Sequence, residues 1–149
     1  MLGLFIIAHA PLATALREAA MHAFPEAAQA IAVYDVLPSA SAEAGLAEAA
    51  ACLAAMGDQE TLILTDVFGA TPCNIARQLA ARPGVRVVAG VNVPMVWRAL
   101  NYRQKSLDDI AALAMAGASQ GVMAVTLNRP QHQTLVPASH DSNDSHHQQ

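Results

Sequence analysis

Residues 61–72 read TLILTDVFGATP and place a short apolar run directly before a turn. The run from Thr61 to Thr65 is nearly continuous rather than alternating, which is typical of a strand buried on both faces. Thr71 and Pro72 carry the pattern of a helix start, with Thr71 at the N-cap and Pro72 at the first helical position. A buried strand, a turn and a helix in this order form the repeating unit of a parallel α/β sheet.

The same unit recurs along the chain. Helical segments separate further apolar runs, which predict strands at 1–8, 31–36, 85–89 and 122–127. We expect one doubly wound α/β domain over residues 1–130, with a mainly parallel sheet covered by helices on both faces. From Gln131 to Gln149 the composition turns to Gln, His, Ser, Asn and Asp, which predicts a disordered polar tail.

Composition excludes several classes of protein. Of 149 residues, 54% are hydrophobic and 13% are charged, so the chain has ample apolar surface to bury and is not intrinsically disordered. A net charge of −4 argues against binding to nucleic acid, which needs a dense Lys/Arg surface. Two cysteines cannot form a disulfide framework. The apolar N-terminus has no basic residue before Arg17, unlike a signal peptide, and we expect a cytoplasmic protein.

Two residues with chemical capability follow the predicted strands. His9 comes after the first strand and Asp66 after the third, and these strands are neighbours in flavodoxin-type folds. A carboxylate that accepts the Nδ1–H of an imidazole fixes the tautomer and leaves Nε2 with a free lone pair. The helix start at Thr71 offers a hydroxyl and unpaired amides that suit an anion. Together these features suggest transient phosphorylation of His9.

Each of these residues also fits an ordinary structural role. His9 alone fits a structural histidine, Asp66 alone a turn residue, and Thr71 alone an ordinary helix start. Dinucleotide binding needs a glycine-rich turn after the first strand, and residues 9–13 hold no glycine. A receiver domain needs an acidic pair where His9 stands and a lysine within the sheet, whereas the single lysine is Lys105.

Three segments resemble the IIA component of the mannose family of the bacterial phosphoenolpyruvate-dependent sugar phosphotransferase system. The first is FIIAH at 5–9, a strand that ends in the histidine phosphorylated in that family. The second, LTDVFGATPCN at 64–74, is similar to the family's D-x-x-G-[GA]-[ST]-P-x-N pattern. The third is AGVNVPM at 89–95, similar to its G-x-N-x-P-M segment. The resemblance covers about residues 1–127.

The resemblance implies a phosphohistidine carrier. His9 would receive a phosphoryl group through Nε2, Asp66 would hold the other ring nitrogen, and Thr71 with adjacent amides such as that of Ala70 would bind the phosphate. The donor would be the carrier protein HPr, the acceptor a IIB component, and membrane IIC and IID subunits are further candidate partners. The implied fold is flavodoxin-like, with four parallel strands and a fifth, antiparallel strand (here 122–127) exchanged across a homodimer. Transfer between histidines needs no metal and no organic cofactor.

Two alternatives to a sugar-uptake relay stay open at this point. One is a regulatory interaction module, whose phosphorylation at His9 is read by a partner without onward transfer. The other is the phosphocarrier subunit of a dihydroxyacetone kinase, which has a similar fold and an N-terminal histidine.

Overall fold

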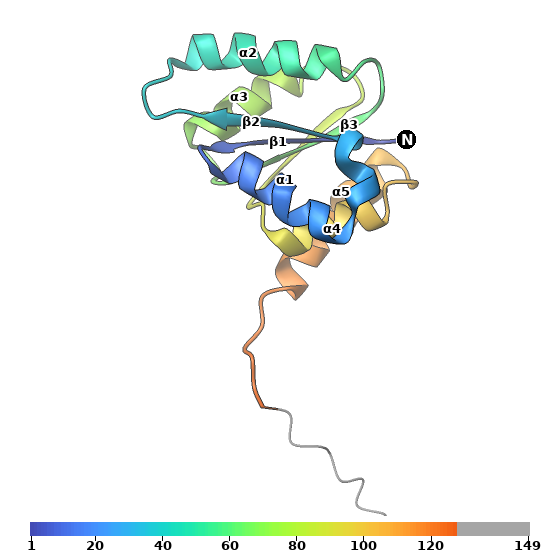
Figure 1. The fold of residues 1–149 in the computed structure, drawn as a ribbon. Coiled ribbons are helices and arrows are strands. Elements are labelled where there is room, and N and C mark those ends of the chain that lie inside the picture. The colour runs from blue at the N-terminus through green and yellow to red at the C-terminus, as the bar shows by residue number, and fades with distance from the viewer. Residues whose placement is uncertain (128–149) are drawn as a thin grey trace, which may run out of the picture.

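A four-stranded parallel sheet forms the centre of the computed structural model, which describes residues 1–127 (Figure 1). The strand order is β2-β1-β3-β4. This is the flavodoxin-type order, in which the chain reverses direction across the sheet between β1 and β3. The strands are β1 (Gly3–His9), β2 (Ile31–Val36), β3 (Thr61–Thr65) and β4 (Val85–Ala89). The predicted parallel α/β sheet is confirmed.

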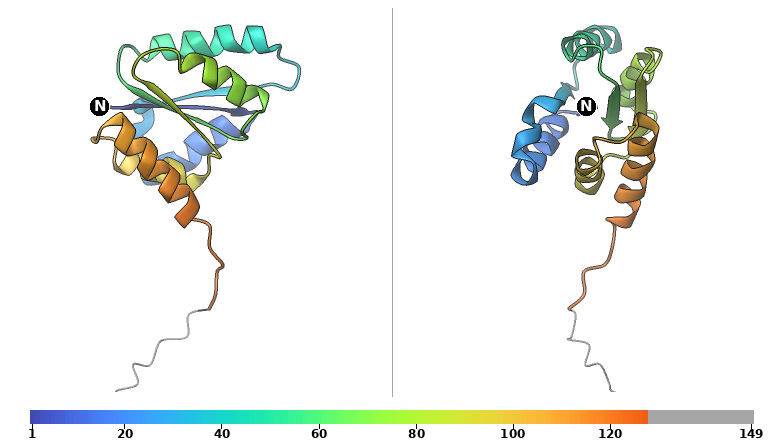
Figure 2. Two further views of the ribbon diagram at one scale, coloured as in Figure 1. Left: turned by 180° about the vertical axis from the view of Figure 1, so that it is seen from behind. Right: turned by 90° about the vertical axis from the view of Figure 1, so that its right-hand side faces the viewer.

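Helices cover both faces of the sheet, as Figures 1 and 2 show from three directions. On one face α1, α4 and α5 pack against Leu4, Ile6 and Ala8, whereas on the other α2 and α3 pack against Phe5 and Ile7. The alternation of β1 side chains therefore divides the core into two layers. The helices are α1 (Leu12–Ala23), α2 (Ala42–Ala55), α3 (Thr71–Leu79), α4 (Val93–Asn101) and α5 (Leu107–Gln120), with a 3₁₀ helix, η1 (Pro25–Ala30), after α1.

Residues 122–127 do not form the predicted fifth strand. Helix α5 continues to Gln120, and the segment beyond Gly121 has no regular structure. Val125 and Leu127 are 97% and 99% exposed. A strand needs a neighbouring backbone for its hydrogen bonds, and this segment leaves α5 away from the sheet (Figure 1). Within residues 1–127 the sheet is wholly parallel, with no antiparallel edge strand.

Two predictions concern the C-terminal end of the chain. The predicted domain boundary at residue 130 and the predicted disordered tail at 131–149 lie outside the described residues. In the part of the chain that the structure describes, no helix combines the length and the apolar character needed to cross a bilayer.

Helices α4 and α5 approach closely at Gly117. A Cβ placed on Gly117 would lie 2.8 Å from the Cβ of Arg98, which is fixed to the α4 backbone. Replacing a helical glycine by alanine normally stabilises by about 0.5–1 kcal/mol. At Gly117 we expect the opposite, a loss of about 1–3 kcal/mol from overpacking, measured by urea unfolding of the Gly117→Ala variant.

Gly45 in α2 provides the control for this prediction. A Cβ there would lie 2.9 Å from Cδ1 of Ile75, the far end of a side chain that can adjust. Gly45→Ala is therefore expected to cost clearly less than Gly117→Ala. Equal free energies of unfolding for the two variants would contradict the close α4–α5 contact.

Candidate functional site

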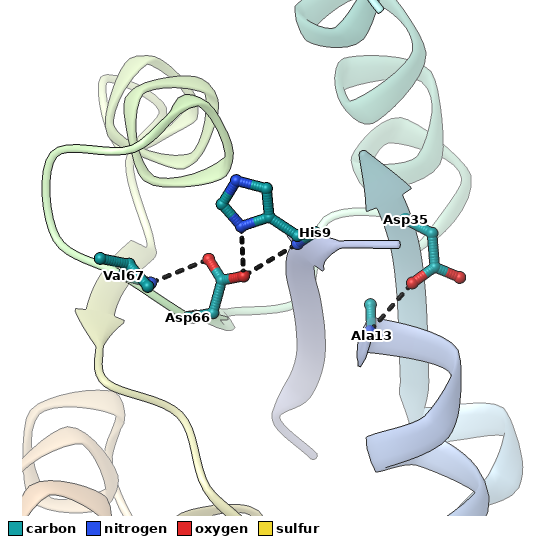
Figure 3. Close-up of polar contacts among 5 residues, drawn as sticks. All are labelled: His9, Ala13, Asp35, Asp66 and Val67. Atoms are coloured by element: carbon teal, nitrogen blue, oxygen red, sulfur yellow. Dashed lines mark hydrogen bonds and ion pairs between the residues drawn. The ribbon is translucent and has the colours of Figure 1, made fainter. Parts of the chain in front are cut away.

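His9 and Asp66 lie side by side at the carboxyl edge of the sheet. β1 and β3 are paired in parallel, with Ile7 opposite Thr65, so the residues that follow them meet. Asp66 Oδ2 lies 2.7 Å from Nδ1 of His9 and also accepts the His9 backbone N–H at 2.9 Å. Its other oxygen, Oδ1, accepts the backbone N–H of Val67 at 2.8 Å (Figure 3).

This geometry decides which ring nitrogen is free. Asp66 Oδ2 can only accept at this distance, so Nδ1 carries the proton and Nε2 keeps its lone pair in the neutral ring. The His9 side chain is 53% exposed, whereas that of Asp66 is 9% exposed. Figure 3 shows the ring on the side of Asp66 and Val67, away from Asp35 and Ala13. The site thus presents an oriented imidazole at the protein surface, with Nε2 not used by the bond to Asp66.

The ionised form of Asp66 is favoured. Partial burial by itself raises the pKa of this carboxyl, but the His9 amide, the His9 ring and the Val67 amide outweigh burial and hold the pKa below its ordinary value of 3.8. A carboxylate at Nδ1 stabilises the positive charge that the ring gains when Nε2 attacks an electrophile. Asp66 is therefore suited both to orient the ring and to balance its charge.

The backbone of Asp66 is itself held by the neighbouring β4–α4 connection. Gly90 donates its N–H to the Asp66 carbonyl at 2.9 Å, and Val91 donates to the Thr65 carbonyl at 3.0 Å. Gly90 has φ of +88°, a conformation that favours glycine. Gly90 belongs to the segment that is similar to the family's G-x-N-x-P-M pattern, and the structure shows that its amide supports the peptide of Asp66.

The start of α3 differs by one residue from the sequence prediction. Ala70 is the N-cap, Thr71 the first helical residue and Pro72 the second. The prediction of Thr71 as the N-cap is wrong because the Ala70 carbonyl already accepts the first helical bond, from Asn74 at 3.0 Å. No side chain caps this helix start, and Ala70 offers none. The Ala70 amide donates a long bond, 3.3 Å, to the Val67 carbonyl.

Asp35 is a polar residue of this edge that the sequence analysis missed. It lies next to last in β2, and Oδ1 accepts the backbone N–H groups of Ala13 at 2.9 Å and Thr14 at 3.2 Å. Its Oδ2 accepts the hydroxyl of Thr14. A signal existed in the sequence, because an acidic residue near the end of an apolar run lies at the same sheet edge as His9.

The surface around His9 and Asp66 carries exposed apolar side chains and is not a closed cavity. Leu37, which follows β2, is 58% exposed, and Val67 and Phe68 are 58% and 83% exposed. Three surface hollows of the described chain are lined by other residues, not by His9 or Asp66. Small-molecule sites are usually concave and enclose most of the ligand. An open apolar rim around an oriented imidazole instead suits contact with another macromolecule.

The fold and the site together define a flavodoxin-like α/β protein with an exposed imidazole oriented by a carboxylate. The family model described as "PTS system fructose IIA component" matches residues 3–115, and the chain belongs to this family, EIIA-man. The chain is thus a IIA component of the phosphotransferase system, a phosphotransfer protein of sugar transport. No match is found among curated protein sequences.

Solved structures agree with this assignment. The mannose/sorbose-specific IIA subunit of the phosphotransferase system from Enterococcus faecalis is 26% identical, with a TM-score of 0.78 over 85% of this chain and 96% of that one. The phosphotransferase component EIIA from Streptococcus agalactiae is 19% identical, with a TM-score of 0.72 over 83% and 97%. A sigma-54 interaction domain protein from Enterococcus faecalis is 13% identical, with a TM-score of 0.63 over 80% and 92%. At 19% and 13% identity, the Streptococcus agalactiae protein and the sigma-54 interaction domain protein show the fold alone.

The lowered pKa of Asp66 gives a first test of the site. We expect the carboxyl ¹³C shift of Asp66 to titrate with a midpoint below 3.8. Because the folded-state pKa is lowered, the ionised carboxylate contributes stability that is present above the ordinary value and is lost as the pH falls through the lowered pKa. In His9→Ala the midpoint should rise only partly, since the amides of residues 9 and 67 still donate. A wild-type midpoint at or above 3.8 would contradict the hydrogen-bonding pattern.

Proposed function

We propose that this chain is a phosphohistidine carrier that accepts a phosphoryl group from phospho-HPr on His9 and passes it to a IIB component. The observation that carries the proposal is the half-exposed imidazole of His9, whose Nδ1 lies 2.7 Å from Asp66 Oδ2. Membership of the EIIA-man family supports the donor and acceptor classes. Such a relay operates in the cytoplasm, and IIC and IID membrane subunits are the proposed partners beyond IIB.

The transfer exchanges one N–P bond for another. The lone pair on His9 Nε2 attacks phosphorus, the bond to the donor histidine breaks, and the donor ring recovers its lone pair. Asp66 keeps the proton on Nδ1 and balances the charge of the phosphorylated ring. The reverse sequence passes the group to the acceptor. Because the two histidine phosphates are chemically alike, positioning and charge balance suffice, and the proposal includes neither a metal nor an organic cofactor.

The start of α3 is the proposed contact for the phosphoryl oxygens. The positive end of a helix and its free amides suit an anion, and no side chain caps α3. The Thr71 hydroxyl stands at the first helical position, where it can add a donor. We also include Ala70, whose amide would exchange its 3.3 Å bond to Val67 for the phosphate.

A regulatory role is the second candidate. The sigma-54 interaction domain protein shares this fold, although 13% identity carries no more than the fold. In that role His9 is phosphorylated and a partner reads the modification, but the group is not passed on. Adding purified IIB to the phosphorylated protein separates the two, since a carrier loses its label to IIB. The D-x-x-G-A-T-P segment at 66–72 and the G-x-N-x-P-M segment at 90–95 favour the mannose-type component over a dihydroxyacetone kinase subunit.

We further propose a homodimer in which residues 122–127 of each chain add an antiparallel strand to the sheet of the other. β4 is an edge strand, so one side of its backbone is open to such pairing. The segment VMAVTL has the composition of a strand, and Val122, Val125 and Leu127 are exposed in the single chain. Pairing with a second copy would bury these side chains and satisfy their backbone groups.

Phosphorylation in a reconstituted system tests the carrier proposal. With phosphoenolpyruvate, enzyme I and HPr, we expect an acid-labile, base-stable phosphate on the wild-type protein and none on His9→Ala. Asp66→Asn should remain folded but take up phosphate about a hundredfold more slowly, because it loses the charge that faces the ring. The measurement is rapid-quench labelling followed by mass spectrometry.

His22→Ala is the matched control, because His22 is an exposed histidine of α1. It should label at the wild-type rate. An unlabelled wild-type protein would end the carrier proposal, and a labelled His9→Ala would move the site elsewhere. A wild-type rate in Asp66→Asn would remove Asp66 from the mechanism.

The dimer proposal predicts that a charge in the exposed segment weakens self-association. Val125→Asp should shift the sedimentation coefficient from that of a dimer toward that of a monomer at micromolar concentration, because the carboxylate would be buried in the added strand. Val67→Asp, which changes an exposed valine of the β3–α3 loop, should leave the mass unchanged. A wild-type chain that sediments as a monomer at all concentrations would refute the exchanged strand.

A further inference from the structure

Helix α1 begins without a cap of its own. Its N-cap residue is Pro11, which has no side-chain oxygen and makes no side-chain cap bond. The first amides of any helix need acceptors from outside the helix. At α1 this need is acute because Ala13 is fully buried and cannot turn its N–H to water.

Asp35 supplies the missing cap from the neighbouring strand. Its Oδ1 accepts the N–H groups of Ala13 and Thr14, and its Oδ2 accepts the Thr14 hydroxyl. All three donors belong to the first turn of α1, and Asp35 is separated from Ala13 by 22 positions in the chain. One partly buried carboxylate thus connects the end of β2 to the start of α1.

The carboxyl end of β2, where Asp35 lies, is also hydrogen-bonded to the backbone around His9. His9 pairs with Val36 and Ala8 pairs with Asp35 in the parallel register of β1 and β2. Just beyond His9, the N–H of Ala10 donates to the Val36 carbonyl at 3.0 Å. The connection from His9 to α1 is therefore bounded on one side by the β1–β2 ladder and on the other by the Asp35 cap.

We propose that Asp35 is a positioning residue for His9: it fixes the start of α1 and with it the connection that sets the direction of the imidazole. This inference rests on the proposed function of His9 as the phosphoryl acceptor. Asp35 touches neither the ring nor, in the proposed transfer, the phosphoryl group. Its effect passes through the backbone of residues 9–14, and Figure 3 shows the ring on the side away from Asp35.

Asp35 also makes the two helix starts at this edge chemically different. A carboxylate occupies the positive end of α1, which offsets the helix dipole there and takes its amides. At α3 no side chain caps the corresponding amides. A phosphoryl dianion on Nε2 therefore meets one available helix start, that of α3, rather than two that compete for it.

Transfer kinetics of Asp35 variants test the inference. Asp35→Ala should slow phosphoryl uptake from phospho-HPr by about tenfold to a hundredfold, since small misplacement of a reacting group has effects of this size. Asp35→Asn should stay within about threefold of the wild type, because asparagine is as good an N-cap as aspartate. Ser106→Ala is the matched control: it removes the cap of α5, where Ser106 Oγ accepts the Asp109 N–H, and should leave the rate unchanged.

A second measurement follows the ring without any phosphate. In ¹⁵N spectra of the wild type, His9 should show a single tautomer with the proton on Nδ1, as the bond to Asp66 requires. Asp35→Ala should show a mixture of tautomers, and Asp35→Asn and Ser106→Ala should match the wild type. General destabilisation would affect Asp35→Ala and Ser106→Ala alike, so a tautomer change confined to Asp35→Ala identifies positioning.

The outcomes separate the two proposals. If the wild type takes up no phosphate, the carrier function fails, and the tautomer measurement alone still decides on Asp35. If a folded Asp35→Ala keeps the wild-type tautomer and rate, Asp35 does not position His9. A loss of rate equal to that of Ser106→Ala, or one that Asp35→Asn fails to recover, also overturns the inference.

Discussion

The hydrogen bond between His9 and Asp66 depends on the parallel pairing of β1 and β3. Parallel strands end at the same edge, so residues that follow them meet without any dedicated scaffold. Asp66 Oδ2 binds both the ring and the backbone N–H of His9, which fixes ring and main chain relative to one carboxylate. In addition, the Gly90 N–H donates a hydrogen bond to the Asp66 carbonyl from the β4–α4 connection. Three hydrogen bonds at one sheet edge thus fix the orientation of the His9 ring.

The sequence was sufficient for the sheet and for this pair because both depend on local signals. Near-continuous apolar runs mark strands buried on both faces, and His9 and Asp66 each follow such a run directly. The single chain forms no fifth strand at 122–127, because an apolar run indicates only that the segment suits a buried strand and not which chain supplies its neighbour. The predicted start of α3 was wrong by one residue, because Thr71 matches an N-cap pattern whereas the actual N-cap, Ala70, has no capping side chain.

The role of Asp35 at α1 could not be read from spacing. Capping patterns describe residues within about four positions of a helix start, whereas Asp35 reaches α1 from 22 positions away. The bond from Gly90 to Asp66 is similar, because it joins two loops that only the folded sheet brings together. Long-range polar contacts of this kind depend on register, and register is fixed by the packing of whole strands.

The division of the core into two layers has a consequence for how this surface can change during evolution. The loops that carry Leu37, Val67 and Phe68 lead into α2 and α3, whereas the exposed segment after Gly121 leaves from α5 on the opposite layer. Side chains of β1 alternate between these layers, so each layer is packed by its own set of residues. The surface proposed for phosphoryl partners and the segment proposed for self-association therefore leave the domain from different helix layers. A substitution in a β2–α2 or β3–α3 loop is therefore expected to change the surface around His9 without touching the segment after Gly121.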